Sequence, residues 1–211
     1  MKRLNQFINE YIVKKKLDKP IDSEDHYEYY PETKKELIKN IVEIFNSGKT
    51  NLNCIDTSKI TDMSNLFDSS NYNKSLDNID ISKWNVSNVK YMQFMFDGYE
   101  NFNCDLSNWD VSKVENMKGI FSWCINFNCD LSKWDVSNVT NMDFMFDNCN
   151  KFDCDLSKWD VSNVLNMICM FGNCKNFKGI GLDNWNVNKV KHMHYMFKGC
   201  TSLINTPSWY K

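Results

Sequence analysis

The sequence contains no alanine, only one arginine (Arg3) and three prolines among its 211 residues. It also lacks an excess of positive charge, because 25 Lys and Arg stand against 27 Asp and Glu, so we expect no nucleic-acid binding. No apolar run approaches the roughly 18 residues of a membrane span. The start, MKRLNQFINEYIVKKK, has no apolar stretch or cleavage site typical of a secretion signal. We therefore predict no membrane insertion and a cytoplasmic location.

Cysteine, in contrast, is frequent, and nine cysteines cannot all pair within one chain. Seven of them recur at the same places of a repeat: Cys104, Cys129 and Cys154 in one column, and Cys124, Cys149, Cys174 and Cys200 in another. Their spacing is not that of a zinc site, and a chain with a full core does not need disulfides. We interpret these residues as small apolar side chains at inward corners, and predict reduced thiols with no metal.

The repeat is marked by tryptophan. Trp84, Trp109, Trp134, Trp159 and Trp185 are separated by 25, 25, 25 and 26 residues. Each opens the pattern W-[ND]-V-[SN]-x-V-x-x-M-x-x-[MI]-F. Self-similarity at this period predicts a solenoid of about 25-residue units.

Two kinds of element are predicted within each unit. The alternating pattern L-x-x-W-x-V predicts a short parallel strand with Trp and Val turned inward. Val139, Met142, Met145 and Phe146 have helical spacing and predict a short helix, for which Ser137 would be the N-cap, as Ser112 would be one unit earlier. The predicted fold class is an α/β repeat solenoid, right-handed and similar to leucine-rich repeats.

Two regions follow from this pattern. Residues 51–211 are predicted to form a solenoid of about six units with a truncated C-terminal cap at residues 207–210. Residues 1–50 lie outside the repeat and are predicted to be an N-terminal helical cap. One helix would carry Leu4, Phe7, Ile8, Tyr11 and Ile12, and a second would run to about Asn46, before Gly48.

The stretch W-D-V-S-N-V-T-N-M-x-x-M-F at residues 134–146 resembles the BspA-like leucine-rich repeats, and the resemblance extends over residues 51–205. It implies a curved solenoid and a bacterial surface protein involved in adhesion or host contact. A surface or secreted location is therefore the alternative to the cytoplasm. The resemblance supplies no catalytic residues.

Candidate binding residues come from the exposed positions on either side of each Trp. They are Lys83, Lys133 and Lys158 before it, and Asn85, Asp110, Asp135, Asp160 and Asn186 after it. One interpretation is a recognition strip for a protein or, alternatively, a glycan. The other is a structural corner, because Asp beside Ser accepts backbone hydrogen bonds in turns. Trp123 and Tyr99 interrupt the repeat and are further candidates for exposed aromatic contacts.

Catalytic motifs are not visible. His192 and His194 are two positions apart and would point to different faces of a helix. No nucleophile with an adjacent base and no glycine-rich phosphate loop is present, so we expect neither enzyme activity nor a cofactor. The predicted function is a non-catalytic protein-protein interaction or adhesion-type module with an unidentified protein partner. The alternative is a structural scaffold or self-assembling layer or coat component. The sequence leaves the oligomeric state open.

Overall fold

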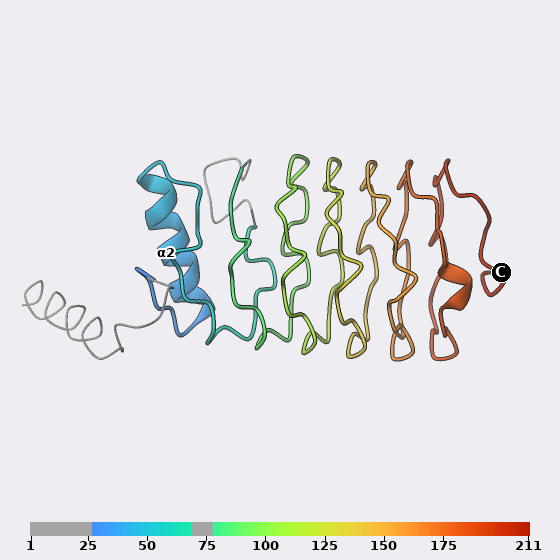
Figure 1. The fold of residues 1–211 in the computed structure, drawn as a ribbon, viewed down its shortest axis with the longest axis horizontal. Coiled ribbons are helices and arrows are strands. Elements are labelled where there is room, and N and C mark those ends of the chain that lie inside the picture. The colour runs from blue at the N-terminus through green and yellow to red at the C-terminus, as the bar shows by residue number, and fades with distance from the viewer. Residues whose placement is uncertain (1–26, 69–77) are drawn as a thin grey trace, which may run out of the picture.

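The structure is a computed structural model that describes residues 27–68 and 78–211. The chain winds in successive coils that stack side by side along one axis (Figure 1). Isolated parallel bridges join each coil to the next, from Asp62 to Tyr91 and then through Asn116, Asn141, Asn166 and His192. From Tyr91 onward the bridged residues are 25, 25, 25 and 26 positions apart, so the period of the sequence is one turn of the coil.

An α-helix, α2 (Lys34–Asn46), lies across the stacking axis at the N-terminal end of the stack (Figure 1). Thr33 caps it by accepting a hydrogen bond from the backbone N–H of Glu36 at 3.2 Å. Its buried side chains are Leu37, Ile41, Ile44 and Phe45, which join the core of the coils. This is the helix predicted to end near Asn46. The helix predicted around Leu4 to Ile12 lies outside the described residues.

The predicted strands are wrong. Segments of the L-x-x-W-x-V type form consecutive four-residue turns, because the N–H of Trp134 bonds to the carbonyl of Leu131 at 3.0 Å and that of Val139 to Val136 at 2.9 Å. The chain changes direction every few residues, and its β-type pairing with the neighbouring coils consists of isolated bridges, not continuous ladders. In the part that the structure describes there is no β-sheet, which overturns the α/β solenoid with parallel strands.

The predicted short helices are also absent from the coils. Successive turns close from Met145 to Met142 and from Asp147 to Phe144, at 3.2 and 3.1 Å. Phe144 has a left-handed backbone with φ of 57°, which is incompatible with an α-helix. Its N–H donates across the stack to the carbonyl of Ile168 at 2.8 Å, instead of four residues back. Ser112 and Ser137 therefore cap no helix.

Aromatic side chains fill the interior in columns that run along the stack. The rings of Phe96, Phe121, Phe146, Phe171 and Phe197 lie with their centroids 5.7 Å apart from one coil to the next. The Trp column also hydrogen-bonds between coils, since the indole Nε1 of Trp134 donates to the carbonyl of Leu106 at 3.0 Å. The same kind of bond is made by Trp84, Trp109, Trp159, Trp185 and Trp209. The expectation that the repeated Trp faces the core is confirmed.

The C-terminal end of the stack is covered by aromatic residues. A short 3-10 helix, η2 (Leu182–Asn184), lies in the last full coil. Beyond that coil, Trp209 stacks on Trp185 with centroids 6.3 Å apart, and Tyr210 packs edge-on against Phe197 at 5.1 Å. These contacts shield the final members of the Trp and Phe columns from water.

Candidate functional site

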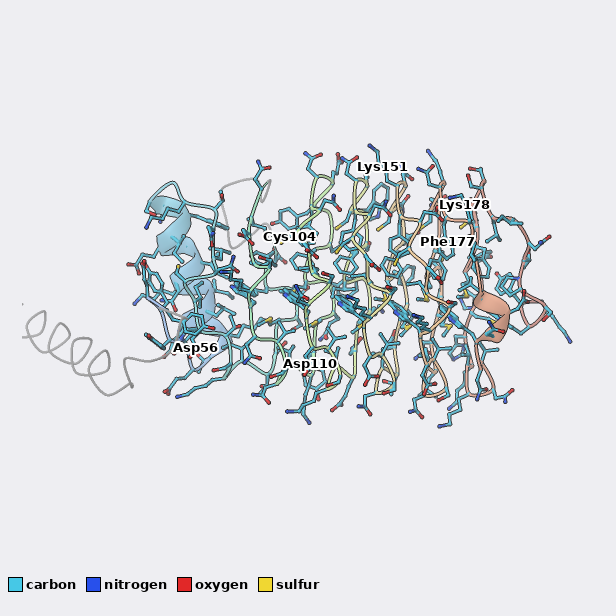
Figure 2. The ribbon with its side chains drawn as sticks, in the orientation of Figure 1. Asp56, Cys104, Asp110, Lys151, Phe177 and Lys178 are labelled. Atoms are coloured by element: carbon cyan, nitrogen blue, oxygen red, sulfur yellow. The ribbon has the colours of Figure 1, made fainter. Side chains whose placement is uncertain are left out.

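The eight candidate binding residues are all exposed and lie on either side of the buried Trp column. They are Lys83, Asn85, Asp110, Lys133, Asp135, Lys158, Asp160 and Asn186. Asp110 marks their place at the lower edge of the stack in Figure 2. The structure therefore places them in two rows on the surface, one on each side of the Trp column.

The aspartates of these rows hold backbone turns. Oδ1 of Asp110, Asp135 and Asp160 accepts a hydrogen bond from the N–H of the serine two residues on, at 3.1, 3.0 and 3.0 Å. Hydrogen bonds from Ser112 and Ser162 lower the carboxyl pKa of Asp110 and Asp160. The contacts made by these carboxylates therefore agree with the structural corner, which was one of the two interpretations of this pattern.

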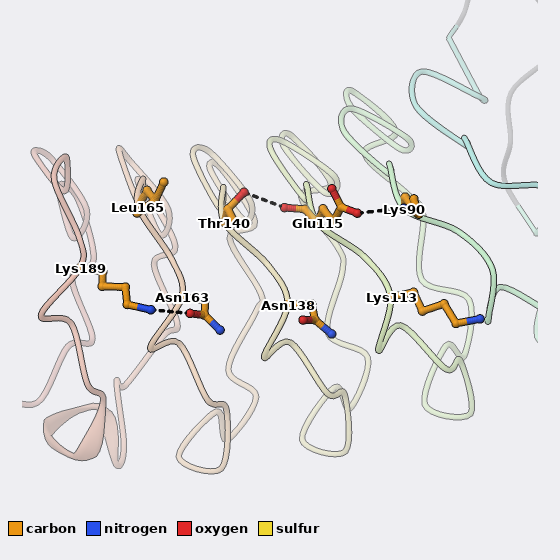
Figure 3. Close-up of a pocket in the computed structure, with 8 residues that line it drawn as sticks. All are labelled: Lys90, Lys113, Glu115, Asn138, Thr140, Asn163, Leu165 and Lys189. Atoms are coloured by element: carbon orange, nitrogen blue, oxygen red, sulfur yellow. Dashed lines mark hydrogen bonds and ion pairs between the residues drawn. The ribbon is translucent and has the colours of Figure 1, made fainter.

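A groove that the sequence interpretation missed lies next to these rows (Figure 3). It is an open hollow of about 640 Å³, formed by positions four and six residues after each Trp. We call it the lysine groove, and its lining residues are Lys90, Lys113, Glu115, Asn138, Thr140, Asn163, Leu165 and Lys189. The signal in the sequence was the variation at the two x positions of V-S-x-V-x, in a repeat that is otherwise nearly constant.

Polar contacts between coils fix the lining of the groove. Nζ of Lys90 lies 3.3 Å from Oε1 of Glu115, and the hydroxyl of Thr140 donates to the carbonyl of Glu115 at 3.1 Å. At the other end, Nζ of Lys189 donates to Oδ1 of Asn163 at 2.7 Å. The lining of the groove therefore contains three lysines and one glutamate.

Aromatic side chains that are exposed or half-buried occur in several coils on the segment whose backbone bonds link successive coils. We call this set the aromatic face, and it consists of Tyr91, Phe94, Trp123, Phe144 and Tyr195. Tyr91, Trp123 and Tyr195 are 41, 51 and 60% exposed, and the two phenylalanines are half-buried. Of the two aromatic residues singled out from the sequence, Trp123 is on this face. Tyr99 is instead half-buried, with its hydroxyl donating to the carbonyl of Phe67.

A lysine bridges two rings of the aromatic face. Nζ of Lys118 lies 5.8 Å from the ring centroids of both Phe94 and Phe144. Gly119 provides the space, because a Cβ on this residue would come within 2.5 Å of the Phe94 ring. The sequence signal for this face was again variation, since Phe94, Gly119 and Phe144 occupy the same column in successive units.

The cysteines of the two repeat columns hydrogen-bond with the backbone of the stack. All nine are free, and Sγ of Cys149 donates to the carbonyl of Phe121 at 2.9 Å, as Cys124, Cys174 and Cys200 do to Phe96, Phe146 and Phe171. Burial raises the pKa of the Cys149 thiol well above its ordinary value. In the other column, Sγ of Cys129 accepts a hydrogen bond from the N–H of Leu106 at 3.2 Å.

Two searches for particular kinds of site cover only the described residues. Residues 27–68 and 78–211 contain no group of three or more His, Cys, Asp or Glu side chains placed to hold a metal ion. Within the same ranges, no helix has the length and apolar character required to cross a bilayer.

Comparison with known proteins gives one result. The profile of a family described as "Mycoplasma protein of unknown function, DUF285" matches residues 36–142 and, in a second overlapping match, residues 108–210. No curated protein and no solved structure matches the chain. The family found is thus not the BspA-like leucine-rich repeats. That resemblance was wrong, as was the leucine-rich-repeat architecture expected from it.

Proposed function

The chain belongs to the DUF285 family, and we propose that it is a non-catalytic protein-binding module whose partner docks on the aromatic face. The observation that carries the proposal is the exposure of large aromatic side chains, with Trp123 and Tyr195 half or more accessible. Tyr, Trp and Phe are enriched at the centres of protein interfaces, where they contribute much of the binding energy.

The contrast between columns supports the same proposal. Core positions such as Trp134 and Phe146 are repeated in nearly every unit, because Phe146 stacks on the equivalent Phe121 of the preceding coil and Trp134 packs against that same Phe121 ring. The column that holds Phe94 and Phe144 also holds glycine, cysteine and tyrosine in other units. A surface whose residues differ from coil to coil presents a unique pattern to a partner, whereas a uniform one offers several equivalent registers.

The experiment compares which proteins two matched double variants retain from an extract of the source cells. Trp123→Ser with Tyr195→Ser removes exposed apolar surface from the aromatic face. Ile180→Ser with Ile204→Ser removes it elsewhere, since these residues are 59 and 62% exposed. We expect a protein that the wild type and the isoleucine variant retain equally, and that the aromatic variant retains at least tenfold less.

Thermal unfolding of each variant establishes that it is folded before the comparison. Equal retention by both double variants would contradict the proposal. Retention of glycans, with no protein, would replace a protein partner by a carbohydrate. Concentration-dependent self-association in sedimentation velocity, without any retained protein, would favour a structural scaffold or self-assembling layer.

A further inference from the structure

We propose that the lysine groove binds an extended peptide segment that carries acidic side chains at both ends and an uncharged middle. The groove is a different surface from the aromatic face, so this proposal and the proposed function stand or fall on separate measurements. Its position along the stack, across several coils, favours a ligand that lies parallel to the stacking axis (Figure 3).

The charge at the two ends of the groove is the first argument. Nζ of Lys113 donates to Oδ1 of Asn88 and Nζ of Lys189 to Oδ1 of Asn163, both at 2.7 Å. These acceptors are neutral amides. No carboxylate of the described residues lies within ion-pair distance of either ammonium group, whereas Lys90 is paired with Glu115. Asp110 and Asp160 are near enough for their charges to interact with Lys113 and Lys189, but neither is within ion-pair distance. The charge of the two lysines is therefore only partly compensated, and a ligand carboxylate can pair with each.

The middle of the groove has a different character. It is lined by Asn138, Thr140, Asn163 and Leu165, none of which is charged. The amide Nδ2 groups of Asn138 and Asn163 are anchored on the carbonyls of Ser112 and Ser137, at 2.7 and 2.8 Å. Leu165 is half-buried and offers an apolar contact.

This distribution selects a peptide over a uniformly charged polymer. A nucleic acid or a sulfated glycan would place negative charge along the whole length of the groove, against the uncharged middle and beside Glu115. A peptide can place carboxylates only where the lysines are and an apolar side chain beside Leu165.

The spacing of the lysines sets the length of the segment. Lys113 and Lys189 lie three coils apart, and three ring spacings of 5.7 Å correspond to about 17 Å. An extended chain rises about 3.3 Å per residue, so this distance takes up about five residues. Because alternate side chains of an extended chain face the same way, acidic residues separated by four to six positions fit the groove.

The test uses a fluorescein-labelled peptide of eight residues with two glutamates at each end and a leucine within its uncharged middle. Fluorescence anisotropy measures its dissociation constant at low ionic strength. We expect saturable binding that weakens at least tenfold in Lys113→Gln with Lys189→Gln. The control, Lys151→Gln with Lys175→Gln, changes the net charge equally at exposed positions; Lys151 lies at the edge opposite Asp110 (Figure 2). It should stay within twofold of the wild type.

Two further peptides test the pattern itself. Replacing all four glutamates by glutamine should abolish binding, and grouping the four glutamates at one end should weaken it at least fivefold. The proposal is overturned if the peptide does not bind saturably, if both lysine pairs matter equally, or if the grouped peptide binds as well as the spaced one. It is also overturned if a single-stranded oligonucleotide or heparin binds more tightly than the peptide and depends on Lys113 and Lys189.

Discussion

Replacing Trp134 by alanine tests whether the aromatic columns hold the stack together. Trp134 is 3% exposed, and its ring lies 6.1 Å from that of Phe121 in a tilted arrangement. Its Nε1 hydrogen-bonds to the carbonyl of Leu106 in the preceding coil. The substitution removes both the packing and this link between coils.

The expected loss has two parts. Truncating a buried aromatic residue to alanine costs about 3–5 kcal/mol, because the apolar contacts disappear and a cavity remains. The lost hydrogen bond adds about 1 kcal/mol. The addition is not larger, because the carbonyl of Leu106 keeps a second hydrogen bond, from the N–H of Trp109 at 3.0 Å. We therefore expect Trp134→Ala to lower the free energy of unfolding by about 4–6 kcal/mol.

Urea denaturation followed by circular dichroism measures this quantity, with Asp135→Ala as the neighbouring control. Asp135 is exposed and loses one turn hydrogen bond to Ser137, so its substitution should cost about 1 kcal/mol. A loss of less than about 2 kcal/mol for Trp134→Ala would refute the reasoning. An equal loss in both variants would refute it too, since the corner would then contribute as much as the core.

Three more predictions concern the whole stack. The Cys149 thiol, buried and with its pKa raised, should react with a thiol reagent only after denaturation; rapid labelling of the native protein, read by mass spectrometry, would contradict its place in the core. The pKa values of Asp110 and Asp160 are lowered in the fold, so these carboxylates stabilise it above the unfolded-state pKa of about 3.9. This contribution disappears as the pH falls through the folded-state pKa, so the unfolding temperature should decrease below about pH 4. The decrease should be smaller in a variant with asparagine at both positions. Deleting one whole unit, Asn101 to Ile125, should leave a folded protein of lower stability, whereas deleting residues 101–112 should be far more disruptive in the same thermal scan, because only the first preserves the register of the columns.

The length of the repeat and the side chains that face the core could be predicted from the sequence, because both follow from which residue type recurs at the same position of each unit. The expected inward position of Trp134 and Val136 agrees with their burial, as does that of Met142 and Met145. Hydrophobic side chains at regular spacing must face a common interior whatever backbone carries them. The sequence therefore indicated which residues form the core.

The backbone conformation could not be derived in the same way, because a spacing of three residues is shared by two structures. Met142 and Met145 occupy one face of an α-helix, but they also occupy the two ends of a four-residue turn, which is what they do here. The deciding feature is the left-handed backbone at Phe144. Phenylalanine rarely adopts this conformation, so the residue type gave no reason to predict it.

The candidate residues beside each Trp were chosen because their pattern is regular, and regularity proved to indicate a structural turn. Asp110 and Asp160 are repeated because each holds the same backbone N–H in its coil. The lysine groove was missed because Lys113 and Lys189 lie three repeats apart in the sequence. They line one groove only because stacking of the coils aligns positions about 25 residues apart.

The same construction explains why some columns vary and others do not. A Trp or Cys that hydrogen-bonds through its side chain to the coil before it, as Trp134 and Cys149 do, requires a side-chain donor at that position; Tyr99 supplies it in the unit before Cys124. Phe144 is linked to the next coil through its backbone N–H, and this bond places no demand on the residue type. Its column can therefore hold glycine at Gly119 and tyrosine at Tyr195 without breaking the stack. Stability thus resides in the columns whose buried side chains pack or hydrogen-bond between coils, whereas an exposed column linked through the backbone alone is free to vary.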